Sequence, residues 1–263
     1  MKIREVVNQI EKDFPIVSMQ DFDNSGSNIV NLDEEISGIL LTLDITIDAI
    51  NFAKENNINF IISHHPIIFN KIKNLNEDPV SKRIKLLNKY DINAYSCHTN
   101  YDANLKYGMG TSLINLLFDN SIIKEQRILE KFKIGDYEYG IGNVIIFNNE
   151  FSFLELKNIF INKLKLDSDK ISFYICKNNI KKIIIIPGSG SGDVDLVIKE
   201  KPDMLITSDL KHNQILDLKE SNISYFNATH YGLENIFIDS FYKYLNDISI
   251  IKNTNIIKYD IKL

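Results

Sequence analysis

The chain has 263 residues, of which 44% are hydrophobic, 25% charged and 10% aromatic, the composition of a soluble globular protein. At about 150 residues per domain, this length allows one large domain or two small ones. Thirty Lys and Arg stand against 35 Asp and Glu, and the net charge of -5 argues against binding nucleic acid or anionic lipid through bulk charge.

Compartment is indicated by the cysteines and by the apolar runs. Cys97 and Cys176 form no CxxC pair, which argues against a disulfide framework and for a reducing compartment. The N-terminus mixes charges throughout, unlike a signal peptide. Apolar runs are interrupted well before the roughly 18 residues of a membrane-spanning helix. We therefore expect a cytoplasmic protein without a membrane partner.

Helical and strand-like patterns alternate along the chain. Residues 1–14 place apolar side chains at helical spacing and predict an amphipathic helix. The following strands are expected at 36–44, 58–62, 92–97, 138–147, 170–177, 181–188, 203–207 and 223–228. Helices are expected at 46–57, where Thr46 is a candidate N-cap, and at 79–90, 110–118, 151–165, 194–200 and 213–221. This alternation predicts an α/β protein with buried, largely parallel strands.

All five histidines follow apolar runs of strand length. They are His64 and His65 after one run, then His98, His212 and His230 after three others. Ligands of open α/β sheets bind beyond the carboxyl ends of the strands. The histidines therefore mark a functional site.

The spacing of these residues favours a metal site. His230 and Glu234 are four residues apart, so on a helix they share one face, with about 5–6 Å between their Cβ atoms. His64 and His65 lie at a strand end, where Pro66 restricts the backbone of His65, and two adjacent histidines suit a dinuclear site with ions about 3.5–4 Å apart. Asp102 adds a carboxylate. Three imidazoles and two carboxylates suit Zn, Fe, Mn or Co better than Mg or Ca.

Each signal also has a simpler interpretation. A lone histidine such as His212 is more often a hydrogen-bonded structural group than a ligand, and an HxxxE spacing alone is common on solvated helices. Two adjacent imidazoles at a strand end are costly to bury unused. Taken together, the clusters favour the metal.

A glycine-rich loop follows the strand expected at 181–188. Gly188, Gly190 and Gly192 would let backbone N–H groups approach a phosphate at a helix N-terminus. The loop matches no complete phosphate-binding motif, because Asp193 replaces the last glycine of GxGxxG. A tight strand-to-helix turn is the alternative.

At these residues the sequence resembles the Nif-three-like family, many of whose members carry the name GTP cyclohydrolase 1 type 2 homologue. The matching stretches are 43–46, 63–66 with Phe69, 98–102, 188–192, 207–212, and His230-Tyr231 with Glu234. Two stretches depart from the family pattern: residues 23–28 carry Ser25 and Ser27 at apolar positions, and Ser208 and Asn213 replace a glycine and a histidine. These departures touch the surroundings of the metals and leave the ligands intact.

The resemblance implies the architecture and the ligand set. It implies two interlinked α/β domains with mixed sheets flanked by helices, which we place at 1–124 with 230–263 and at 125–229. It implies a toroidal homohexamer. It also implies two divalent transition-metal ions per subunit, bound by His64, His65, Asp102, His230 and Glu234. His98 stays open between a direct ligand and a residue that supports the ligands.

Hydrolysis of a nucleotide-like small molecule is the function we expect, with opening of a purine ring as its most specific form. Two metals can activate a water nucleophile, and Lys211 and His212 are expected to bind an anionic group or to act in proton transfer. One alternative is a non-catalytic metal-binding or regulatory scaffold, which would use the same ligands. Another is a metallophosphoesterase acting on generic phosphate esters.

Overall fold

The chain forms two compact units in the computed structural model, which describes residues 1–135, 137–248, 251 and 254–261. The first unit comprises Met1–Tyr107 with Phe237–Leu263, and the second comprises Gly108–Ile236. The sequence-based division instead places 108–124 and 230–236 in the first domain. The structure assigns them differently because helix α5 (Met109–Leu117) and the short helix α9 (His230–Glu234) pack on strands of the second unit.

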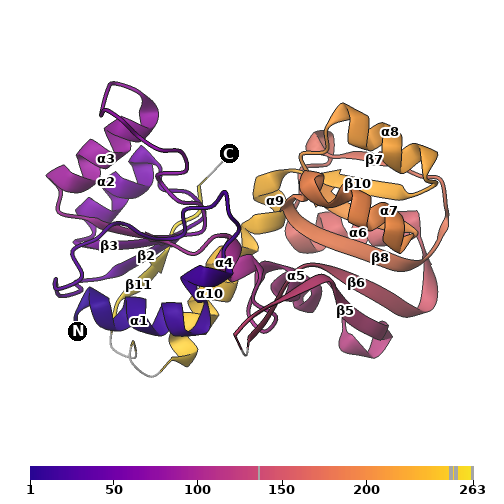
Figure 1. Ribbon diagram of the computed structural model, residues 1–263, viewed down its shortest axis with the longest axis horizontal. Coiled ribbons are helices and arrows are strands. Elements are labelled where there is room, and N and C mark those ends of the chain that lie inside the picture. Colours follow the sequence, from indigo (N-terminus) through magenta and orange to yellow (C-terminus); the bar gives the residue numbers. More distant parts are fainter. Residues whose placement is uncertain (136, 249–250, 252–253, 262–263) are drawn as a thin grey trace. The chain divides into compact units, whose positions relative to one another are not determined.

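A five-stranded sheet lies at the centre of the first unit (Figure 1). Its order is β1-β4-β3-β2-β11, with β4, β3, β2 and β11 parallel and β1 antiparallel to β4. The strands are β1 (Gly26–Ile29), β2 (Ile39–Thr42), β3 (Phe60–Ser63), β4 (Asn93–Ser96) and β11 (Ile256–Lys258). Because β2, β3 and β4 are parallel, their carboxyl ends meet at one edge of the sheet.

Helices cover both faces of this sheet. α2 (Ile47–Glu55) and α3 (Pro79–Lys89) lie on one face, and α1 (Ile3–Asp13) and α10 (Ile236–Asp247) lie on the other (Figure 1). Short helices η1 (Ile16–Ser18) and α4 (Thr99–Asp102) complete the unit. The side chain of Thr46 accepts a hydrogen bond from Ala49 N at 3.0 Å, which confirms it as the N-cap of α2.

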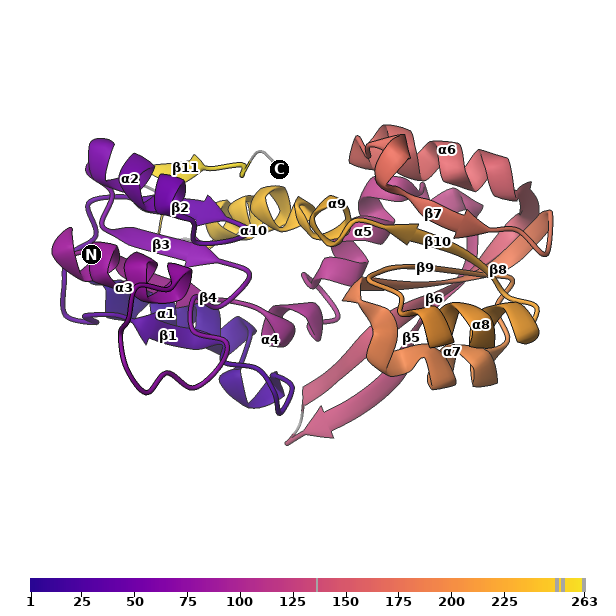
Figure 2. The same ribbon diagram turned by 90° about the horizontal axis from the view of Figure 1, so that it is seen from above.

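The second unit is built on a six-stranded sheet of order β5-β6-β8-β9-β10-β7 (Figure 2). β8, β9 and β10 are parallel, whereas β5, β6 and β7 pair antiparallel with their neighbours. The strands are β5 (Ile123–Ile134), β6 (Tyr137–Ser152), β7 (Ser172–Tyr174), β8 (Asn179–Ser189), β9 (Met204–Ser208) and β10 (Ser224–Ala228). The carboxyl ends of the three parallel strands again meet at one edge.

Helices flank this sheet on both faces as well. α7 (Val194–Glu200) and α8 (His212–Glu220) cover one face, and α5 and α6 (Phe153–Leu164) cover the other (Figure 2). The short helices η2 (Asn120–Ile122), η3 (Ser168–Lys170), η4 (Gly190–Asp193) and α9 (His230–Glu234) connect these elements. The expected α/β fold with two mixed, helix-flanked sheets is confirmed.

The sequence patterns miss several elements at sheet edges. β1 and β11 are short edge strands, and β5 is an edge strand whose side chains are mostly exposed or half-buried, so none of them shows the apolar run of a buried strand. The expectation of largely parallel strands is wrong for the second sheet, whose outer strands are antiparallel. Among the described helices, none is long and apolar enough to span a membrane.

An aromatic cluster joins the two ends of the chain within the first unit. The ring of Phe14, directly after α1, lies 4.8 Å from Tyr244 and 5.7 Å from Phe241, both on α10. It also lies 5.4 Å from Tyr101, and the Tyr244 hydroxyl donates to Asp13 at 2.7 Å. The returning C-terminal segment is therefore held on the N-terminal helix by buried aromatic packing.

Phe14→Ala is expected to lower the free energy of unfolding by about 3–5 kcal/mol, because it opens a cavity between α1 and α10. The measurement is the urea unfolding transition followed by circular dichroism. Val17→Ala is the control, since the Val17 side chain is 65% exposed, and it should change stability by less than about 0.5 kcal/mol. Equal, small effects of both variants would contradict this assignment of the core.

Candidate metal centre

Polar residues follow β2, β3 and β4, three neighbouring parallel strands of the first sheet. Asp44 comes after β2, His64 and His65 after β3, and His98 after β4. The N–H of His65 donates to the carbonyl of Leu43 at 3.0 Å, so the chain stays paired beyond the end of β3. The three histidines therefore gather at one edge of this sheet.

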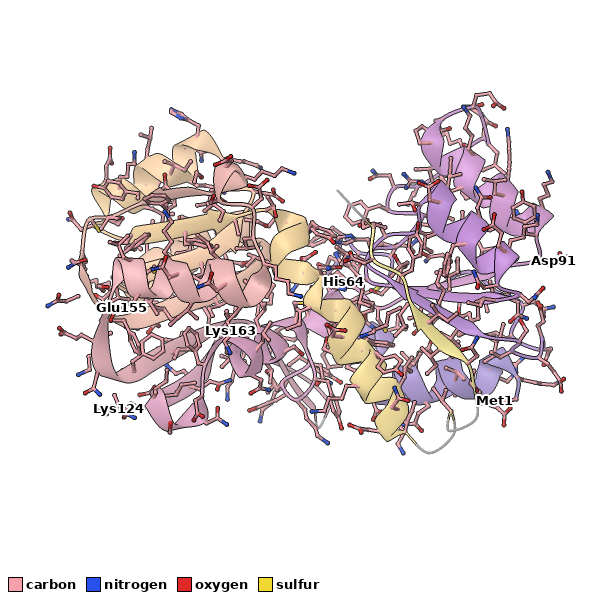
Figure 3. The ribbon with its side chains drawn as sticks, turned by 180° about the vertical axis from the view of Figure 1, so that it is seen from behind. Met1, His64, Asp91, Lys124, Glu155 and Lys163 are labelled. Atoms are coloured by element: carbon pink, nitrogen blue, oxygen red, sulfur yellow. The ribbon has the colours of Figure 1, made fainter. Side chains whose placement is uncertain are left out.

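The imidazole rings of these histidines lie close together. Ring centroids are separated by 5.0 Å for His64 and His65, 5.1 Å for His64 and His98, and 5.4 Å for His65 and His98. One ring nitrogen from each lies within 4.8 Å of the others. His64, labelled in Figure 3, is fully buried and packs 5.1 Å from Phe237 of α10. The three rings form a cluster of nitrogen donors that can hold a metal ion.

An acceptor engages Nδ1 of each ring. His64 Nδ1 donates to the carbonyl of Cys97 at 2.8 Å, His65 Nδ1 to Asp44 at 2.8 Å, and His98 Nδ1 to Asp23 at 2.7 Å. A carbonyl or carboxylate only accepts, so Nδ1 carries a proton in each ring, and in the neutral ring Nε2 carries the lone pair. Histidine ligands of metals are oriented in this way.

Asp23 is the most constrained of these acceptors. Its side chain is buried and accepts hydrogen bonds from His98, from Ser25 Oγ at 2.6 Å, and from the backbone and hydroxyl of Thr99 at 3.1 and 2.6 Å. Burial raises the pKa of Asp23, but the hydrogen bonds from His98, Ser25 and Thr99 outweigh it and hold the pKa well below its usual range. Asp23 therefore stays ionised at neutral pH.

Asp102 and Cys97 lie next to the histidine cluster. Asp102 Oδ1 is 3.7 Å from His64 Nε2, which places a carboxylate beside the buried imidazole. Cys97 is a free, fully buried thiol, and burial raises its pKa well above the ordinary value. At neutral pH its sulfur is therefore a neutral thiol, while its carbonyl orients His64.

A second set of candidate ligands lies at the carboxyl edge of the parallel strands in the second unit. His230 begins α9 after β10, and its Nε2 lies 2.8 Å from Oε2 of Glu234 one turn later. Its Nδ1 contacts Asp209, which follows β9, at 2.6 Å. Thr229 caps α9 through a 3.0 Å hydrogen bond from Gly232 N. The turn presents an imidazole and a buried carboxylate side by side.

Gly188 makes room for the Glu234 carboxylate. It lies in β8 with φ +64°, and a Cβ built on it would come 2.2 Å from Glu234 Oε1 and 3.6 Å from His230 Cε1. Its carbonyl accepts a 2.6 Å hydrogen bond from Ser208 Oγ. A side chain at this position would be strained by the left-handed backbone and would displace the carboxylate.

The other two glycines of the loop differ in what surrounds them. A Cβ on Gly190 would come 2.4 Å from Thr207 Oγ1, whereas one on Gly192 would meet no atom within 4 Å.

Lys211 and His212 are exposed at the start of α8. The backbone N–H of Lys211 donates to Gln214 Oε1 at 2.7 Å, and its side chain is open to solvent.

Three aspartates that orient the histidines are missing from the residues expected to form the site. They are Asp23, Asp44 and Asp209, each of which contacts Nδ1 of a histidine. Asp44 and Asp209 directly follow strand-like runs, as the histidines do, and that signal points to them. Asp23 precedes β1 and is brought to His98 only because β1 pairs with β4.

Residues 1–262 match the model of the family described as Duf34/NIF3 (NGG1p interacting factor 3). Relatives named GTP cyclohydrolase 1 type 2 homolog include one from Clostridium perfringens, 33% identical, with the match covering 89% of this chain and 87% of the relative. One from Clostridium acetobutylicum is 34% identical over 89% of this chain and 85% of the relative.

Solved structures resemble the chain over its whole length. The crystal structure of Staphylococcus aureus protein SA1388 has a TM-score of 0.87 at 25% identity, covering 100% of this chain and 97% of that one. Reduced HcgD from Methanocaldococcus jannaschii has a TM-score of 0.80 at 28% identity, covering 99% of this chain and 98% of that one.

Gly188→Ala is expected to displace the Glu234 carboxylate and to weaken metal binding at least about 10-fold, in the range seen when the supports of a metal ligand are disturbed. The measurement is metal affinity by competition with a coloured chelator. Gly135→Ala is the matched control, because Gly135 also has a left-handed φ of +59° but nothing within 4 Å of a Cβ. Equal losses in both variants would attribute the effect to backbone strain alone.

Asp44→Asn is expected to weaken metal binding about 10- to 100-fold while the protein stays folded, because an amide is a poorer acceptor for His65 Nδ1 than a carboxylate. The same chelator competition measures it, with circular dichroism to check folding. Asp33→Asn is the control, since Asp33 pairs only with exposed Lys2 and Arg4 among the contacts described here. Unchanged affinity in Asp44→Asn would remove His65 from the ligand set.

Proposed function

The chain belongs to the Duf34/NIF3 family, and from this premise we propose that it is a metal-dependent hydrolase acting on a nucleotide-like small molecule. The observation that carries the proposal is the histidine cluster of the first unit, whose rings are oriented by a carbonyl and two carboxylates. One buried and two half-buried imidazoles, each oriented by an acceptor at Nδ1, are arranged as the histidine ligands of a metal site are.

Two divalent transition-metal ions, chosen among Zn, Fe, Mn and Co, are the cofactors we propose. His64, His65 and Asp102 of the first unit and His230 and Glu234 of the second would bind them, with His98 as a further nitrogen donor. A His–Glu pair alone provides two donors, fewer than the three or four protein ligands of an ordinary zinc site. The pair of the second unit is therefore not a complete metal site by itself.

The residues present fit such a group. Nitrogen and carboxylate donors together suit transition metals better than Mg or Ca, and the space at Gly188 is occupied by the Glu234 carboxylate. When bound, two such ions make water a nucleophile at neutral pH and polarise the group under attack. Asp23 and Asp44 keep the proton on Nδ1 of His98 and His65, so that Nε2 remains the donor atom.

Lys211 and His212 have side chains that suit binding of an anionic substrate and proton transfer. The Lys211 side chain is exposed and cationic, which suits an anionic group such as a phosphate. His212 is exposed beside it, and its imidazole can both accept and donate a proton, as a proton-transfer group requires. The name of the clostridial relatives, GTP cyclohydrolase 1 type 2 homolog, supports a purine nucleotide as the substrate class.

The partners we propose are this small-molecule substrate and further copies of the chain. Resemblance to the family implies a toroidal homohexamer. Light scattering coupled to size-exclusion chromatography measures the mass and tests the assembly.

Metal-loaded protein is expected to hydrolyse GTP, and Lys211→Ala should lower kcat/KM at least about 10-fold without loss of metal, because it removes a charge-assisted contact. The measurement is GTP turnover by chromatography, with elemental analysis of the same samples. Lys199→Ala, which removes an exposed lysine of α7, is the control.

Metal content tests the ligand set independently of turnover. Glu234→Ala and Asp102→Ala should each lose at least one equivalent of metal and remain folded. Wild-type metal content in both would remove these carboxylates from the ligands. Reversible metal binding with no turnover of GTP or of a panel of nucleotides and phosphate esters would favour a non-catalytic metal-binding protein, and turnover of generic esters would favour a metallophosphoesterase.

A further inference from the structure

Two large aromatic side chains beside the histidine cluster are exposed to solvent. The side chain of Phe22 is 62% exposed and that of Phe69 is 47% exposed, and their ring centroids lie 6.2 Å apart. The ring of Phe69 lies 6.1 Å from that of His98, edge to face. Exposure of apolar rings is unfavourable, and these two lie next to the residues that orient a metal ligand.

Hydrogen bonds hold the backbone next to both rings. Phe22 directly precedes Asp23, the buried carboxylate that accepts from His98 and Thr99. Phe69 directly follows Ile68, whose carbonyl accepts from Asn24 Nδ2 at 2.6 Å. The loop before β1 and the loop after β3 are thereby tied to each other and to His98. The two rings are exposed, yet the segments that carry them are anchored.

We propose that Phe22 and Phe69 form a stacking surface for the flat heteroaromatic ring of the substrate, such as a purine base, beside His98. The inference rests on the proposed function for its substrate class, but it concerns binding and not the chemical step. Aromatic side chains stack on the faces of nucleobases without needing a particular hydrogen-bond pattern. A ring held there lies next to the nitrogen cluster.

The composition of this surface favours the heteroaromatic ring of a small molecule over a protein partner. It consists of two rings that contact each other and, through Phe69, a candidate metal ligand. The segments that anchor the rings are the segments that orient that ligand, through Asp23 and Asn24. Placement of a substrate ring relative to a metal ligand requires such shared anchoring, whereas a surface that packs on another chain does not.

The chain contains no tryptophan, which makes the test direct. Phe69→Trp introduces a single tryptophan at the surface, and GTP is expected to quench the tryptophan emission saturably in both metal-free and metal-loaded protein. Inorganic triphosphate should not quench it. Phe173→Trp is the matched control, since Phe173 is 41% exposed in the second unit, and GTP should produce no saturable quenching there.

Affinity measurements identify the contribution of each ring. Phe22→Ala and Phe69→Ala are each expected to weaken GTP binding to otherwise wild-type protein about 10-fold by titration calorimetry, within the range for loss of one stacking contact. Phe69→Tyr should retain the affinity because the ring remains, whereas Phe69→Leu should not. Metal content should stay unchanged in all four variants.

Three results would overturn the inference. The first is that Phe22→Ala and Phe69→Ala both turn over GTP with unchanged KM and bind it with unchanged affinity. This result would leave the hydrolase proposal intact. Another is equal quenching by GTP and inorganic triphosphate. The last is a change of assembly mass in Phe22→Ala or Phe69→Ala with GTP affinity unaltered, which would show that the rings cover an interface between copies. Ring-dependent GTP binding without turnover would instead support the stacking surface and contradict only the hydrolase.

Discussion

The hydrogen bond from His98 to the buried carboxylate of Asp23 is the contact on which the first unit's site depends. It joins the segment before β1 to the segment after β4, and the same carboxylate accepts from Ser25 and Thr99. A buried carboxylate without these donors would be costly. With them it is ionised, so His98 has a fixed tautomer, and Phe22 is held beside the cluster by its direct neighbour.

In the second unit, too, an aspartate contacts Nδ1 of a histidine. Asp209 contacts Nδ1 of His230, and Glu234 lies against the backbone of Gly188, where a Cβ would collide with its carboxylate. Both units thus place a histidine at the carboxyl edge of parallel strands and orient it with an aspartate from a neighbouring segment. The glycine-rich loop, a predicted phosphate cradle, begins with Gly188, which leaves space for the Glu234 carboxylate.

Periodicity located most of the α/β elements because buried parallel strands and amphipathic helices have strong local patterns. It missed β1, β5 and β11, since edge strands are short or half-exposed and lack such a pattern. The division into units was also placed differently, because α5 is an ordinary amphipathic helix whose sequence does not state which sheet it covers. Packing on β6 and β8 decides that.

By itself, the sequence determined the α/β alternation, the family and the positions of the histidines after strand ends, because these are properties of residues close together along the chain. Only the tertiary structure decided which acceptor orients each ring. Asp23 lies 75 positions before His98 and reaches it through the antiparallel pairing of β1 with β4. The exposure of Phe22 and Phe69 was likewise decided there, since an aromatic residue in a sequence is expected in a core. Long-range pairing and solvent exposure depend on how the whole unit packs, and no local pattern encodes them.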